Sequence, residues 1–90
     1  MTGARLETIR ARLNAAFSPT ALTIRDDSAR HAGHPGARGG AGHYAIKIEA
    51  DAFRGLRSVA RHRLVYDALA DMLPDEIHAL SIDATAPGER

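Results

Sequence analysis

Apolar residues in this chain recur with two different periods, and the order of those periods along the chain restricts the possible folds. A helical spacing predicts a first helix over about residues 3–16 and a second, longer one over 58–73. The segments 22–25 and 44–49 instead alternate apolar with polar residues, as half-buried strands do. A last strand is predicted over residues 77–84. The apolar residues with the helical spacing of the first helix are Leu6, Ile9, Leu13 and Phe17.

The segment between the second strand and the long helix predicts a short additional helical turn. Asp51 is expected to cap this turn and Gly55 to stop it, while Ser58 is expected to cap the main helix. Pro74-Asp75-Glu76 should end that helix. The resulting order is α-β-β-α-α-β, which predicts an α+β domain whose helices cover one face of a three-stranded mixed sheet.

Length, charge and cysteine content narrow the class of protein. Ninety residues suffice for one domain (1–90) with a modest core, but not for a deep substrate cavity. No nucleophile–base pair, nucleotide loop or carboxylate dyad can be named, so we do not expect an enzyme. A net charge of +1 is below that of dedicated nucleic-acid binders. No apolar segment is long enough for a signal peptide or a membrane span, which predicts a cytoplasmic protein without membrane contact.

A glycine-rich loop between the first two strands, at about residues 29–42, carries three of the five histidines at or near its ends. We expect this loop to be flexible. The spacing His31-x-x-His34 is common in chelating sites, but histidine is also tolerated in a solvated loop. Because the chain has no cysteine and no carboxylate pair near the loop, the residues alone do not favour an autonomous metal site.

The other two histidines lead to different expectations. His62 falls in the predicted apolar stripe of the main helix, which favours a partly buried, structural side chain. His78 shares parity with Leu80 and Ile82 but begins its strand, so its ring is expected at the rim of the core. A rim imidazole held by packing is suited to metal ligation. The predicted stripe consists of Val59, His62, Val65, Tyr66, Leu69, Met72 and Leu73.

Basic residues gather around the start of the main helix and acidic residues lie toward its end. This order opposes the helix macrodipole, which favours acidic residues first. A solvated face would explain the pattern, but so would a positive end kept for a negatively charged partner. The basic residues are Arg54, Arg57, Arg61 and Arg63.

Several short motifs occur in one order over nearly the whole chain, from Leu6 to Pro87. They are Asp27-Ser28 with His31, His43-Tyr44, Phe53-x-Gly55, Arg61-His62-Arg63 and Ile77-His78-Ala79-Leu80. As an ordered set they resemble the BolA family. The resemblance implies that family's α-β-β-α-α-β fold, which is similar to a type II KH domain. The last six residues, 85–90, contain Pro87-Gly88 and are expected to fray.

The resemblance to the BolA family also implies a function. Such proteins bind monothiol glutaredoxins and share a [2Fe-2S] cluster with them in cluster maturation, trafficking or iron sensing. The glutaredoxin and glutathione supply thiolates, and the BolA-type chain supplies histidines, here matching His78 and His31, with His34 as a substitute. The isolated chain is expected to hold no cluster and to be a monomer or a weak dimer.

A rival function implied by the same resemblance is transcriptional regulation by DNA binding. The arginine cluster and the KH-like topology support it. KH domains that bind nucleic acids clamp the backbone with a Gly-x-x-Gly loop between helices. The corresponding turn here, Gly55-Leu56-Arg57-Ser58, lacks the second glycine. Gly33-x-x-Gly36 lies between strands instead, so the adaptor function is favoured over DNA binding.

Overall fold

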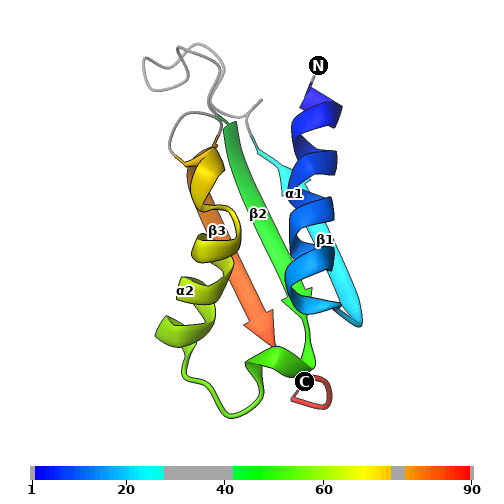
Figure 1. Ribbon diagram of the computed structural model, residues 1–90, viewed down its shortest axis with the longest axis vertical. Helices are drawn as coiled ribbons and strands as arrows, with labels where there is room; N and C mark the ends of the chain where they lie inside the picture. Colours follow the sequence, from blue (N-terminus) through cyan, green and yellow to red (C-terminus); the bar gives the residue numbers. More distant parts are fainter. Residues whose placement is uncertain (1, 28–41, 74–76, 90) are drawn as a thin grey trace.

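The computed structural model describes residues 2–27, 42–73 and 77–89, and it has two layers (Figure 1). Helices α1 and α2 lie on the same face of a three-stranded sheet. The predicted α+β class and the order of elements are confirmed. The elements are α1 (Thr2–Phe17), β1 (Ala21–Asp26), β2 (Gly42–Glu49), the 3₁₀ turn η3 (Asp51–Phe53), α2 (Ser58–Ala68), the 3₁₀ turn η4 (Ala70–Met72) and β3 (Ile77–Thr85).

The sheet is mixed, as predicted, with β2 in the centre. β1 pairs with β2 antiparallel, from Ala21 opposite Glu49 to Asp26 opposite Tyr44. β3 pairs with β2 parallel, so the chain between them must cross from one end of the sheet to the other. The helix α2 makes that crossing. The end of β1 and the beginnings of β2 and β3 therefore lie at one end of the sheet.

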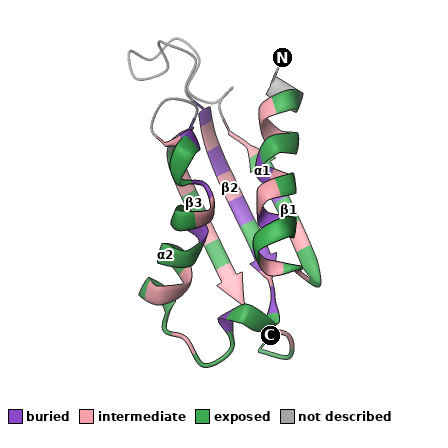
Figure 2. Ribbon diagram, viewed as in Figure 1, coloured by how far each residue is buried: buried purple, intermediate pink, exposed green. Residues whose placement is uncertain are grey.

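The core lies between the sheet and the two helices. Buried residues follow β2 and the inner sides of the helices (Figure 2). Alternation along β2 places Ile46 and Ile48 in the core and leaves Lys47 exposed on the opposite face. Phe53 in η3 is fully buried, and its ring centroid lies 5.0 Å from that of Phe17 at the end of α1. No helix in the described ranges is long and apolar enough to cross a membrane.

The main helix differs from its prediction in length and capping. α2 stops at Ala68 because the Leu69 amide is shared between the carbonyls of Val65, at 3.2 Å, and Tyr66, at 3.1 Å, and the chain then tightens into η4. Ser58 is the first helical residue rather than the cap. The N-cap position is held by Arg57, whose side chain makes no capping hydrogen bond. Asp51 likewise begins η3 instead of capping it.

The predicted apolar stripe of the main helix is confirmed for Val65, Leu69 and Met72, which are buried, but is wrong on its other side. Val59 and Tyr66 are exposed at 69% and 39%, and His62 is exposed as well. Because these three residues face solvent, the predicted partial burial of His62 is also wrong. The face toward the sheet instead carries Arg61 and the fully buried Val65, followed by the buried residues Leu69 and Met72.

The predicted frayed tail is ordered along most of its length. Thr85 is the last residue of β3, and its carbonyl accepts a hydrogen bond of 2.9 Å from the amide of Ala50. Ala86 is fully buried. The carboxylate of Glu89 accepts hydrogen bonds from the amide of Ala86 and the guanidinium of Arg61. These long-range contacts fold the tail back onto the domain.

Candidate functional site

The end of the sheet at which β1 stops and β2 and β3 start is the candidate site. The segment 28–41 connects β1 to β2, so it leaves and returns to the sheet at this end. His31 and His34, the predicted loop ligands, lie outside the described residues. Gly42, predicted as the last loop residue, instead begins β2 opposite Ile77 of β3. The beginning of β3, with His78, therefore lies beside the returning end of this segment.

A β-bulge lies at His78. Gly42 is opposite Ile77, but the next residue of β2, His43, is opposite Ala79, so His78 is the extra residue of β3. The simple alternation that grouped His78 with Leu80 and Ile82 is broken at this point. Ile77, the first residue of the strand, is fully buried. Bulges occur preferentially at sheet edges and beside active sites, where they change the direction of a side chain.

His43 lies on the uncovered face of the sheet at the same end. Its side chain is half-buried and lines a shallow pocket of about 210 Å³. The amide of Asp27 donates a hydrogen bond of 2.7 Å to the carbonyl of His43, which ties the end of β1 to the start of β2. The pocket is lined by Asp27, His43, Tyr44, Ala79, Leu80 and Ser81.

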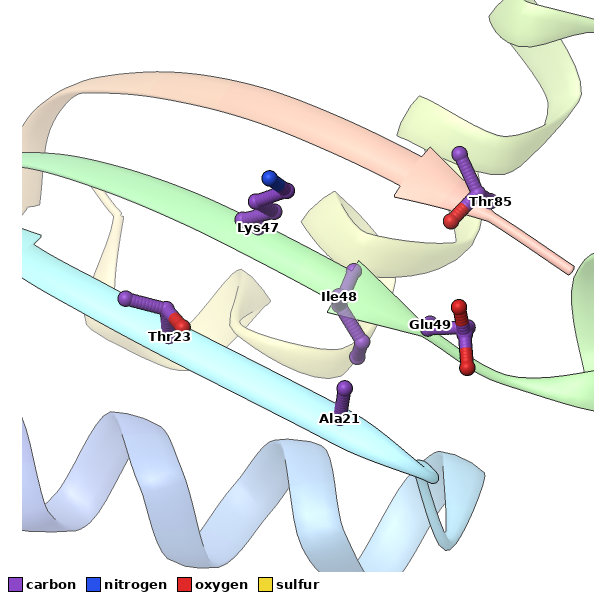
Figure 3. Close-up of a pocket in the computed structure, with 6 residues that line it drawn as sticks. All are labelled: Ala21, Thr23, Lys47, Ile48, Glu49 and Thr85. Atoms are coloured by element: carbon purple, nitrogen blue, oxygen red, sulfur yellow. The ribbon is translucent and has the colours of Figure 1, made fainter. Parts of the chain in front are cut away.

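A larger hollow, of about 330 Å³, lies at the opposite end of the sheet (Figure 3). Its lining contains no histidine and mixes aliphatic side chains with one cation, Lys47, and one carboxylate, Glu49. We therefore do not assign the candidate site to it. Among residues 2–27, 42–73 and 77–89, no group of three or more histidine, cysteine or carboxylate side chains is arranged to hold a metal ion.

Two of the four clustered arginines are engaged within the molecule. The side chain of Arg61 is 12% exposed and donates hydrogen bonds to the carbonyls of Leu56 and Ala84 and to both carboxylate oxygens of Glu89. Arg54 donates to the carboxylate of Asp51 and the carbonyl of Pro87. The cluster predicted as a nucleic-acid surface is therefore partly structural.

The remaining two arginines, Arg57 and Arg63, are exposed and form no ion pair with a described residue.

The contact with Arg61 also affects the ionisation of Glu89. The hydrogen bonds from Arg61, and then the one from the Ala86 amide, lower the pKa of Glu89 from 4.5 to about 2.

Comparison with known proteins fits this geometry. The family model described as BolA-like protein matches residues 13–89. The chain belongs to the BolA-like family. Among solved structures, the BolA domain of SufE1 from Arabidopsis thaliana resembles this BolA-like chain with a TM-score of 0.84 and 43% identity. The match covers 96% of this chain and 95% of that one.

Two relatives of this BolA-like chain differ in name and in the share of their length that the chain spans. SufE-like protein 1, chloroplastic/mitochondrial, of Arabidopsis thaliana is 45% identical over 97% of this chain, which spans only 25% of the length of that protein. The DNA-binding transcriptional regulator BolA of Escherichia coli (strain K12) is 37% identical over 84% of this chain, which spans 70% of that protein.

Sequence reasoning missed the roles of two residues. The alternation of β2 already places His43 on the face opposite Ile46 and Ile48, so it could have been assigned to the open side of the sheet. For Arg61, no local signal exists, because its partner Glu89 lies 28 residues further along the chain.

Proposed function

We propose that this chain is a non-enzymatic, cytoplasmic adaptor of iron–sulfur metabolism that binds a monothiol glutaredoxin and shares a [2Fe-2S] cluster with it. His78 is the principal ligand from this chain, and His31 is the second, with His34 as its substitute. One observation carries the proposal: the bulge at His78 lies at the beginning of β3, next to the point where the histidine-bearing segment rejoins the sheet. Thiolates come from the glutaredoxin and from glutathione.

The donor set of this chain suits a mixed-ligand cluster. Without cysteine, the chain offers only nitrogen and oxygen donors, and imidazole ligation of [2Fe-2S] clusters is known from sites in which two histidines replace two cysteines on one iron. His43 places a further imidazole on the open face of the sheet. It lies opposite Ala79, the residue that follows His78 in β3. When bound, the cluster supplies electron transfer and transferable iron and sulfide, while this chain positions one side of it.

Chain connectivity supports His31 as the loop ligand. His31 follows Asp27 by four residues, so the chain can carry it no further than about 14 Å from Asp27. His34 follows Asp27 by seven residues and is less closely tethered to the sheet. Ordering a glycine-rich segment costs conformational entropy, so we expect loop ligation to be weaker than ligation by a residue of a strand.

The proposal is tested by coexpressing the full chain with a monothiol glutaredoxin and measuring the visible absorption spectrum and the native mass of the complex. The parent should yield a coloured heterocomplex with one [2Fe-2S] cluster. His78→Ala should lose the cluster while the two proteins still associate. His62→Ala is the matched control, because it removes an exposed imidazole from α2. An unchanged spectrum in the His78 variant would reject the ligand assignment.

DNA-binding transcriptional regulation is the second candidate function, and the name of the Escherichia coli relative supports it. The internal engagement of Arg54 and Arg61 weighs against it. If the chain regulates transcription, Arg57 and Arg63 provide the accessible cations. Replacing both with Gln should weaken binding to a promoter fragment, and the parent should discriminate between promoter and unrelated DNA at physiological salt.

A further inference from the structure

The C-terminal turn, residues 86–89, covers the basic start of α2, and two arginine side chains hold it there. Arg61 of α2 binds Glu89, and Arg54 from the segment before α2 donates a bond of 3.0 Å to the carbonyl of Pro87. Ala86, at the base of the turn, is fully buried. In Figure 1 this turn lies beside the segment that leads from β2 to α2.

Glu89 occupies two of the hydrogen-bond donors of Arg61. A guanidinium has five N–H donors. Here one is used by the Leu56 carbonyl at 2.8 Å and one by the Ala84 carbonyl at 3.0 Å. Two more bind the carboxylate of Glu89, at 2.6 and 2.8 Å. The charge of Arg61 is therefore neutralised by a bidentate partner, and four of its five donors are occupied.

Arg57 lies one helical turn before Arg61 and has no such partner in the part of the chain that the structure describes. Its carbonyl accepts the 3.0 Å hydrogen bond from the Arg61 amide, so the two residues share one side of the helix start. Arg54 reaches the same C-terminal turn from the preceding segment. Two arginines thus bind one carboxylate-bearing turn, and Arg57 lies one helical turn from the second of them.

We propose that Glu89 is an autoinhibitory cover on a phosphate-binding surface formed by Arg54, Arg57 and Arg61, and that nucleic acid is the ligand of the uncovered surface. The proposal takes its ligand from the second candidate function and is independent of the cluster-sharing function. With the turn closed, Glu89 offsets the charge of Arg61, so the positive end of α2 presents less charge to a polyanion than its arginines could supply. Once the carboxylate is removed, two guanidinium donors and one positive charge become available beside Arg57.

The experiment measures binding of a short DNA duplex of arbitrary sequence to the parent, to Glu89→Gln and to Glu7→Gln over a range of salt concentrations. Glu89→Gln keeps the shape of the side chain and one acceptor. Glu7→Gln is the matched control, because it also removes one negative charge and unpairs an arginine, Arg10, in an exposed pair on α1. Melting curves verify that all the proteins are folded.

Glu89→Gln should bind the duplex roughly three- to tenfold more tightly than the parent at low salt, with a salt dependence steeper by about 1 in its slope. Adding Arg57→Gln should remove most of that gain. An affinity equal to that of the parent, or a gain no larger than that of Glu7→Gln, would overturn the proposal. The transcriptional function fails on a different result, namely the absence of sequence discrimination by the parent.

Discussion

The two ends of the sheet are built in opposite ways. At one end, β1 stops and β2 and β3 start, the ladder is interrupted by a bulge, and histidines are present in strands on both sides of the irregularity. At the other end, the last residue of β3 is paired with Ala50, and the chain that follows is held by Arg61 and Arg54. The comparison teaches that one end of this small fold is fixed by side-chain bonds to the C-terminal turn, whereas the other end has an irregular ladder beside the proposed ligands.

The largest expected effect is on the lifetime of the proposed shared cluster, at the end of the sheet that carries His78. His78 belongs to a strand, whereas His31 belongs to the glycine-rich segment for which the sequence predicts an entropic cost of ordering. We expect His78→Ala to shorten the lifetime of the cluster in the glutaredoxin complex by about 10- to 100-fold or more, and His31→Ala to shorten it less. Cluster absorbance followed over time provides the measurement. Equal lifetimes for the two variants would remove the distinction between strand and loop ligands.

A second prediction compares one glycine from each end. A Cβ atom on Gly42 would lie 2.5 Å from Cε2 of the buried Tyr44 ring, so Gly42→Ala should cost about 1–3 kcal/mol of the free energy of unfolding. Gly55 has a φ of +79° and no atom within 4 Å of such a Cβ, so Gly55→Ala should cost only about 1–2 kcal/mol of backbone strain. Chemical denaturation measures both. A larger loss for Gly55→Ala would show that backbone conformation outweighs packing here.

A third prediction concerns the pH dependence of stability at the end of the sheet where Arg61 binds Glu89. The folded-state pKa of Glu89 is lowered from 4.5 to about 2 by the hydrogen bonds from Arg61 and the Ala86 amide. The stabilisation by this carboxylate is therefore fully present above the ordinary pKa and is lost as the pH falls from 4.5 toward 2. The melting temperature of Glu89→Gln should lie below that of the parent at neutral pH and converge with it near pH 2. A constant difference across this range would exclude Glu89 as the titrating group.

The smallest effect is expected for His62, on the outer face of α2. Because its side chain is exposed, His62→Ala should change the free energy of unfolding by no more than about 0.5 kcal/mol. Leu69→Ala, which truncates a fully buried side chain directly after α2, should lower the free energy of unfolding by about 2–5 kcal/mol. Thermal or denaturant unfolding compares the two. A loss in the His62 variant close to that of the Leu69 variant would restore the structural role that periodicity first suggested.

Periodicity predicted the elements of this fold well but not their rotation or their long-range contacts. The alternation of Tyr44, Ile46 and Ile48 was sufficient to identify the central strand. On α2, apolar residues occur on two sides of the helix, so the spacing of Val59 and Tyr66 could not reveal that solvent covers them. Tertiary packing against the sheet selects the face that carries Val65 and Leu69.

The candidate site was predicted in part. The position of His78 at the start of the last strand was anticipated, but the bulge depends on the register between β2 and β3, which no pattern within either strand encodes. The contact between Arg61 and Glu89 could not be predicted for a similar reason, because the two residues lie 28 positions apart in the chain. His31 and His34 lie outside the described residues, so their roles stay predictions.

The bulge also affects how this protein meets other copies of itself. β3 is the outer strand next to β2, and an outer strand exposes backbone groups that can template pairing with another chain. Here the ladder is irregular at His78, and near the far end of the strand the Ala84 carbonyl is already bonded to Arg61. The regular, uncapped stretch between them is only a few residues long. An incoming strand would meet a ladder that is irregular at one end and engaged by Arg61 near the other, and bulges of this kind are one way in which proteins blunt an edge against aggregation.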